Sequence, residues 1–214
     1  MMTVSILSLS ARGDNEVAVT FELREGEHIQ KETFLISSVQ MADWSLRRGE
    51  STRESYDLVS HGASVYYATK RGLYLLGYGS CSAQSLCRKL IAKGLSRDVA
   101  REAVAELSRA GYINEAADAK REAERCVAKA WGKRRVISAL CAKGYSQEAI
   151  REAMNALEDD GVDYVALCVE QIRKRGGVVP SSPAERQRQI AALTRYGFSS
   201  AEIREAFTCL RDEQ

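Results

Sequence analysis

The stretch LIAKGLS, residues 90–96, decides the fold because two near-copies follow it, LCAKGYS at 140–146 and LTRYGFS at 193–199. The three glycines are 50 and then 53 residues apart. A glycine is well suited to ending a helix because it readily adopts the left-handed backbone conformation. The serine two residues later is a preferred N-cap for the next helix. Each stretch therefore predicts a helix, a tight turn and a second helix.

The similarity continues beyond these turns, in the same register. Arg-Glu-Ala recurs at 101–103, 151–153 and 204–206, and a leucine follows four residues later each time. We expect a further helix before each helix-turn-helix, at about 64–78, 114–129 and 162–175. The pattern therefore predicts tandem three-helix, helix-turn-helix-like repeats in an elongated curved array. The expected repeats are 64–110, 111–160 and 161–214, and a flexible link is expected at 176–183.

The N-terminal part has a different pattern. Val17, Val19, Phe21 and Leu23 alternate with more polar residues, which is typical of a half-buried strand. Apolar runs before and after it, with turn residues between, predict an antiparallel β-meander with a short helix over residues 1–48. Residues 49–63 are expected to form a linking helix that begins with a capping box of Ser51 and Glu54. The predicted fold is mainly α with a small N-terminal β segment.

Composition argues against several classes of protein. The chain of 214 residues has six cysteines without a C-x-x-C pair and two histidines, so neither a metal site nor a cofactor is expected. No polar side chains are arranged as a catalytic set, so we expect no enzyme. The N-terminal residues resemble no signal peptide, and no apolar run is long enough to cross a membrane. The sequence predicts a cytoplasmic protein with reduced cysteines.

Basic residues carry the clearest functional signal. Residues 1–60 hold six basic and ten acidic side chains, a balance of −4, whereas residues 61–214 have a balance of +6. A basic pair recurs 24 residues before each turn glycine, and a second set recurs on the following helix in repeats two and three. The pairs are Lys70–Arg71, Lys120–Arg121 and Arg173–Lys174, and the second set is Lys133 with Arg186 and Arg135 with Arg188.

These ten residues are the predicted binding face, because periodic cations attract a phosphate backbone or an acidic protein groove. The alternative is that they are ordinary solvated helix charges paired with nearby glutamates. Such exposed pairs contribute about 0–1 kcal/mol each.

Aromatic residues accompany some of these cations. Tyr66, Tyr67, Tyr74 and Tyr78 surround the first basic pair, and at helical spacing we expect them in the core. The alternative is that they stack on single-stranded bases. Trp131 is expected to pack between repeats.

The order of the motifs resembles one known family. The motifs are SLCRKL at 85–90, followed by Lys93-Gly94, then GYIN at 111–114 and WGKRRV at 131–136, followed by Lys143-Gly144. In this order they resemble the RecX family of bacterial regulatory proteins, which are built from tandem three-helix repeats. The resemblance covers about residues 64–211.

The resemblance implies a non-enzymatic modulator in DNA recombination, DNA repair and the SOS response. Such proteins bind the RecA recombinase and its filament on single-stranded DNA and inhibit its ATPase and strand exchange. The implied partners are RecA and DNA, single-stranded and also double-stranded, and we expect a monomer. The alternative from the residues alone is a helix-turn-helix DNA-binding regulator, which the repeated glycine turns suggest.

Overall fold

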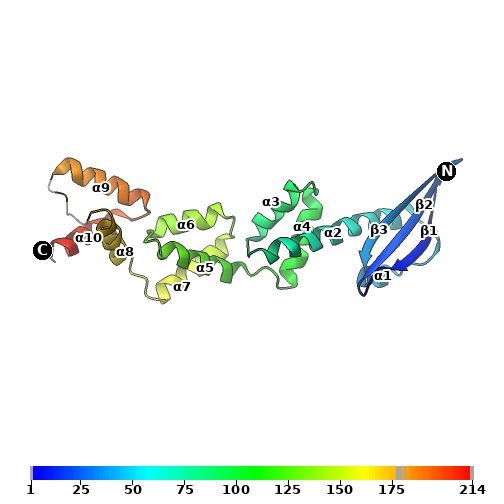
Figure 1. Ribbon diagram of the computed structural model, residues 1–214, viewed down its shortest axis with the longest axis horizontal. Coiled ribbons are helices and arrows are strands. Elements are labelled where there is room, and N and C mark those ends of the chain that lie inside the picture. The colour runs from blue at the N-terminus through cyan, green and yellow to red at the C-terminus, as the bar shows by residue number, and fades with distance from the viewer. Residues whose placement is uncertain (1, 177–179, 181, 213–214) are drawn as a thin grey trace. The chain divides into compact units, whose positions relative to one another are not determined.

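The computed structural model describes residues 2–176, 180 and 182–212 (Figure 1). This part of the chain contains ten helices and one four-stranded sheet. The mainly helical fold with a small N-terminal antiparallel sheet is therefore confirmed. The chain divides into unit 1, Met1–Gly79 with Leu86–Tyr112, and unit 2, Ser80–Ser85 with Ile113–Gln214. Of the predicted flexible link, residues 177–179 and 181 lie outside the described residues.

Unit 1 begins with the sheet. Its strands are β1 (Met2–Ala11), β2 (Glu16–Glu25), β3 (His28–Ser37) and β4 (Gly49–Ser51), in the order β3-β2-β1-β4. Each neighbouring pair is antiparallel, and the short helix α1 (Ser38–Asp43) follows β3. The fourth strand was not predicted. Three residues are too short a run to show the alternation that marks a strand.

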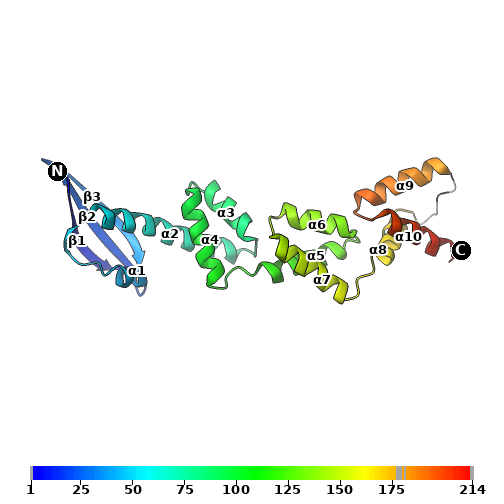
Figure 2. The same cartoon turned by 180° about the vertical axis from the view of Figure 1, so that it is seen from behind.

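Helix α2 (Arg53–Gly77) joins the sheet to the first repeat (Figures 1 and 2). Its first half packs Val59 and Ala63 against the core of the sheet, and its second half packs against α4. The predicted linking helix and the first helix of the repeat are thus one continuous helix. The prediction that Ser51 caps it is wrong, because Ser51 pairs with Val4 in the sheet. Thr52 is the N-cap instead, and it accepts a hydrogen bond from the amide of Ser55 at 3.2 Å.

The remaining helices follow in sets of three, with α2 as the first helix of the first set, and the predicted repeat boundaries stay a prediction. The second and third helices of the first set are α3 (Ala83–Ala92) and α4 (Arg97–Arg109). The second set is α5 (Glu115–Val127), α6 (Lys133–Ala142) and α7 (Gln147–Asp159), and the third is α8 (Tyr164–Lys174), α9 (Pro183–Arg195) and α10 (Ser200–Asp212).

The turn in each set has the predicted chemistry. Gly94, Gly144 and Gly197 have φ values of 91°, 79° and 94°. The amide after each glycine donates back to the carbonyl of the leucine five residues earlier, at 3.2–3.4 Å, as in a Schellman motif. Ser96 and Ser146 accept hydrogen bonds from the amides three residues later, and Ser199 does the same for Glu202. The repeated leucines and alanines are buried in every set.

The repeats of unit 2 meet at joints that the sequence did not reveal. The Ser82 hydroxyl, just before α3, donates to the Lys143 carbonyl in the turn after α6, at 2.8 Å. Fifty residues later, the amide of Gly132 donates to the Tyr196 carbonyl in the turn after α9, at 2.9 Å. Within unit 2, Ser82 thus contacts the glycine turn after α6, and Gly132 contacts the glycine turn after α9.

Candidate functional site

The predicted basic pairs lie on the first helix of each set. Lys70 and Arg71 are on α2 in unit 1, whereas Lys120–Arg121 and Arg173–Lys174 are on α5 and α8 in unit 2. All six side chains reach solvent to some degree. Their immediate partners differ from pair to pair.

Lys70 is tied to the sheet of unit 1. Its Nζ lies 2.5 Å from Oε1 of Glu16 on β2, and the hydroxyl of Tyr66 donates to the same oxygen at 3.1 Å. The hydrogen bond with Glu16 raises the pKa of Lys70, and the same bond lowers the pKa of the Glu16 carboxyl. Most of the Lys70 charge is therefore compensated locally.

Two predicted cations meet the acidic end of α7. Lys120 Nζ lies 3.0 Å from Asp160 and 4.0 Å from Glu124, and Asp160 raises the pKa of Lys120. Lys133 at the start of α6 pairs with Glu158. The acidic end of α7 therefore pairs with two predicted cations of the second repeat, one on α5 and one on α6. These pairs are about half exposed, so they add little stability and phosphate can compete for them.

Arg121 pairs with a carboxylate that is almost fully buried. Asp118 is 6% exposed, and its Oδ1 contacts the guanidinium of Arg121. A carboxylate so shielded from water requires a charged partner, which gives Arg121 a structural role. In the third pair, Lys174 lies 2.6 Å from Glu170, four residues earlier on α8. Arg173 is exposed on the same helix.

Arg135 belongs to an aromatic cluster at the joint between α6 and the turn after α9. Its guanidinium carbon lies 4.1 Å from the ring centre of Trp131 and 4.9 Å from that of Tyr196. A second cation lies over each ring: Lys129 Nζ is 5.3 Å from the ring centre of Trp131, and the guanidinium carbon of Arg175 is 5.4 Å from that of Tyr196. Trp131 itself is half-buried against the core of the second repeat. It therefore packs on the core of its own repeat and holds cations by cation–π attraction, and its packing between repeats stays a prediction.

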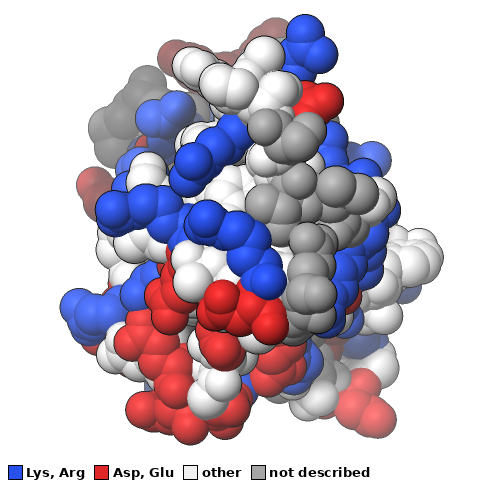
Figure 3. Space-filling view, turned by 90° about the vertical axis from the view of Figure 1, so that its left-hand side faces the viewer, with Lys and Arg blue, Asp and Glu red and all other residues white. Residues whose placement is uncertain are grey.

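Two arginines of the predicted face lie on α9. Arg186 and Arg188 are both exposed. Arg188 and Arg175 line a cavity of about 230 Å³ between α8 and α9, with apolar residues around them. Figure 3 looks onto unit 2 from the side of α9 and α10, and Lys and Arg side chains gather over one region of this face.

The tyrosines beside the first basic pair differ from the prediction. Tyr66 is half-buried, but Tyr67, Tyr74 and Tyr78 are 61%, 54% and 77% exposed. Their assignment to the core is wrong for these three, because the buried face of α2 is built from smaller residues. Those residues include Ala63, Val65, Ala68 and Gly72.

Among residues 2–176, 180 and 182–212, no group of three or more His, Cys, Asp or Glu side chains is placed to hold a metal ion. Within the same ranges, every helix is too short or too polar to span a bilayer.

Comparison with known proteins identifies the family. A family model described as the third three-helix domain of RecX matches residues 162–207. "Regulatory protein RecX" of Stenotrophomonas maltophilia strain R551-3 is 32% identical over 137 residues, which cover 64% of this chain and 83% of that protein. The protein of the same name from Chromobacterium violaceum is 30% identical over 135 residues, or 63% of this chain and 85% of the relative.

Solved structures agree on the fold. A crystal structure of regulatory protein RecX superposes with a TM-score of 0.71 at 16% identity, over 95% of this chain and 98% of that one. RecX from Lactobacillus salivarius gives 0.58 at 20% identity, over 69% of this chain and 97% of that one. With relatives matched over more than four fifths of their length, this chain belongs to the RecX family of regulatory proteins.

Proposed function

We propose that this chain is a non-enzymatic regulator of homologous recombination and DNA repair that acts in the cytoplasm. It binds RecA and the RecA filament on single-stranded DNA, and it inhibits the ATPase and strand exchange of that filament. The observation that carries the proposal is the match to relatives named Regulatory protein RecX over 83–85% of their length.

The charge distribution of unit 2 supports contact with a nucleoprotein filament. Arg186, Arg188 and Arg175 present guanidinium groups on or beside α9, and none of them forms an ion pair with a carboxylate among the described residues. Guanidinium groups bind phosphate oxygens through paired hydrogen bonds. Lys120 and Lys133 can join this face once phosphate replaces their exposed carboxylate partners. We therefore assign the strongest phosphate contacts to α9.

Arg121 is assigned a different part. Its partner Asp118 is buried, so releasing Arg121 to a phosphate would strand a shielded carboxylate. Charge reversal at Arg121 would consequently perturb folding as well as binding. The α9 arginines are cleaner probes because exposed side chains can be reversed without disturbing a core.

Binding to a preformed filament tests the proposal. The protein is mixed with RecA assembled on a single-stranded oligonucleotide, and co-sedimentation is measured beside binding to the bare oligonucleotide. We expect capture by the filament, and weaker capture of the double variant Arg186→Glu, Arg188→Glu. The matched control reverses Arg101 and Arg204, two exposed arginines on the third helices of their sets. Sequence-selective binding to duplex DNA without binding to the filament would instead support a helix-turn-helix regulator.

A further inference from the structure

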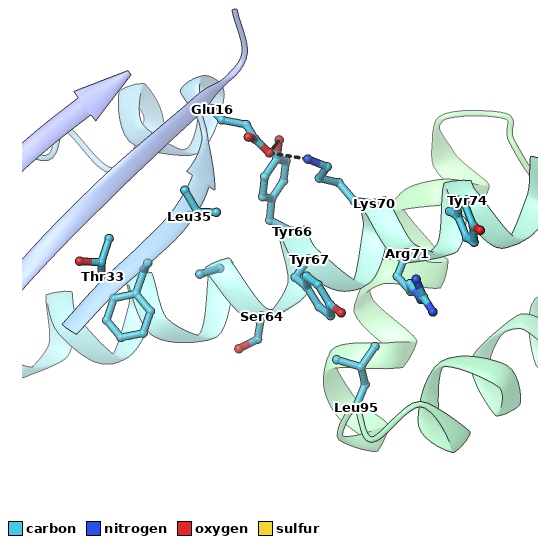
Figure 4. Close-up of a pocket in the computed structure, with 12 residues that line it drawn as sticks. Glu16, Thr33, Leu35, Ser64, Tyr66, Tyr67, Lys70, Arg71, Tyr74 and Leu95 are labelled. Atoms are coloured by element: carbon cyan, nitrogen blue, oxygen red, sulfur yellow. Dashed lines mark hydrogen bonds and ion pairs between the residues drawn. The ribbon is translucent and has the colours of Figure 1, made fainter. Parts of the chain in front are cut away.

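Unit 1 contains a groove of about 570 Å³ between the sheet and α2 (Figure 4). Such a volume is typical of ligand-binding pockets. One wall is strand β3 at Thr33, Phe34 and Leu35, and the other is α2 with Tyr67, Arg71 and Tyr74, with Leu95 nearby. All of these residues belong to unit 1.

The strand wall is a free sheet edge. β3 is the outermost strand of the order β3-β2-β1-β4, so it pairs only with β2. Side chains alternate between the two faces of a strand, so a groove lined by three consecutive residues runs along the strand's edge. Along that edge, unpaired amides and carbonyls point away from β2. Leu35 is 48% exposed beside them. An edge of this kind is a template for one more strand.

The helix wall offers aromatic anchors. Tyr67 and Tyr74 are seven residues apart on α2, about 10 Å along the helix, and more than half of each side chain is exposed. Arg71 lies between them, with its guanidinium carbon 5.3 Å from the ring centre of Tyr74. Figure 4 shows Tyr67 and Arg71 extending from the same side of α2 toward Leu95. Tyrosine and arginine are the residues that most often anchor protein interfaces.

Charge distinguishes a protein segment from a nucleic acid. Lys70 on the rim is compensated by Glu16, whereas Arg71 has no carboxylate partner within the described part of the chain. The groove therefore offers one cation, and residues 1–60, which include the sheet, have a charge balance of −4. A phosphate backbone requires several cations and avoids a negative surface. A single carboxylate on an otherwise apolar peptide fits these charges.

We propose that an extended segment of the protein partner adds to β3 as a further strand, packs apolar side chains against Leu35 and Tyr67, and places a carboxylate on Arg71. The partner is RecA, and this assignment rests on the proposed function. The groove is then a second contact for the same regulator, one that recognises protein rather than DNA.

Hydrogen exchange on the full chain tests this contact, with DNA-free RecA and a thymidine oligonucleotide as separate probes. We expect RecA to slow amide exchange at residues 29–35 and the oligonucleotide to leave it unchanged. Arg71→Glu and Tyr67→Ala should each weaken RecA binding about tenfold. The matched controls Arg101→Glu and Tyr112→Ala alter exposed residues of unit 1 outside the groove and should bind like the wild type.

The outcomes separate the two proposals. If RecA binds without slowing exchange at residues 29–35, and Arg71→Glu binds equally well, the groove is not the contact while the proposed function stands. If only the oligonucleotide slows exchange at residues 29–35, the groove binds a nucleic acid and not a peptide, and the inference is overturned. If RecA does not bind the wild type, the proposed function fails, and the assignment of the groove to RecA fails with it.

Discussion

Gly132→Ala should open the joint between the second and third repeats. A Cβ at this position would lie 2.4 Å from the carbonyl carbon of Gly197 and 2.5 Å from the amide nitrogen of Phe198. Both atoms are backbone, so no side-chain rotation relieves the clash. Gly197 is fixed in the left-handed region by the turn, with φ at 94°, so the turn cannot easily adjust. The start of α6 must therefore move away from the turn.

The cost follows from the contacts that are lost. The amide of Gly132 donates to Tyr196 at 2.9 Å, and that of Arg134 donates to Gly197 at 3.2 Å. Each such hydrogen bond contributes about 1 kcal/mol net. The contact of Arg135 with the Tyr196 ring adds about 0.5–1 kcal/mol. Opening the joint should become easier by about 2.5–3 kcal/mol, which corresponds to about 70- to 150-fold in its equilibrium constant.

Native-state hydrogen exchange measures this opening directly. In Gly132→Ala, the amides of residues 132 and 134 should exchange about 70- to 150-fold faster. The matched control is Gly77→Ala, where a Cβ meets nothing within 4 Å and alanine favours the helix. That variant should leave both amides unchanged. Equal protection of these amides in Gly132→Ala and the wild type would refute the close approach of the two glycines.

Three further predictions concern charge and titration. Arg188→Glu should weaken binding to single-stranded DNA and reduce the slope of log affinity against log salt concentration by about 1, as measured by fluorescence anisotropy. An unchanged slope would show that Arg188 makes no phosphate contact. Burial raises the pKa of the Cys168 thiol to about 12, so this thiol should resist alkylation at pH 8 in the folded protein, whereas exposed Cys141 should react. Mass spectrometry of digests measures both reactions, and early labelling of Cys168 would contradict its burial. Lys70 lowers the pKa of the Glu16 carboxyl, so the bond between them stabilises the fold above the ordinary carboxyl pKa and is lost as pH falls through the lowered value. Lys70→Met should return the titration midpoint of Glu16, measured by NMR, toward its ordinary value. An unchanged midpoint would refute the pairing.

The helices of the repeats were predictable because local chemistry determines them. A glycine such as Gly144 and a serine such as Ser146 end one helix and begin the next without help from distant residues. The strands β1–β3 follow from alternation in the same way. Strand β4 could not be predicted, since Ser51 joins the sheet only by pairing with Val4, far away in sequence.

The predicted site depended more on distant contacts. Sequence spacing found the recurring cations, but it could not show that Lys120 meets Asp160 or that Arg121 is held by a buried Asp118. The exposure of Tyr67 was missed for a similar reason, because helical periodicity does not reveal which face of α2 meets its neighbours. The sequence does carry one signal for the two joints, because Ser82 and Gly132, which form them, are 50 residues apart, the interval between the first two turn glycines.

We propose that this chain regulates RecA on single-stranded DNA. The most direct test is the ATPase rate of a preformed RecA filament, titrated with the protein at ratios below one per RecA monomer. We predict inhibition at substoichiometric ratios, and weaker inhibition by the Arg186→Glu, Arg188→Glu variant. An ATPase rate that stays constant at every ratio, with circular dichroism showing the protein folded, would contradict the account.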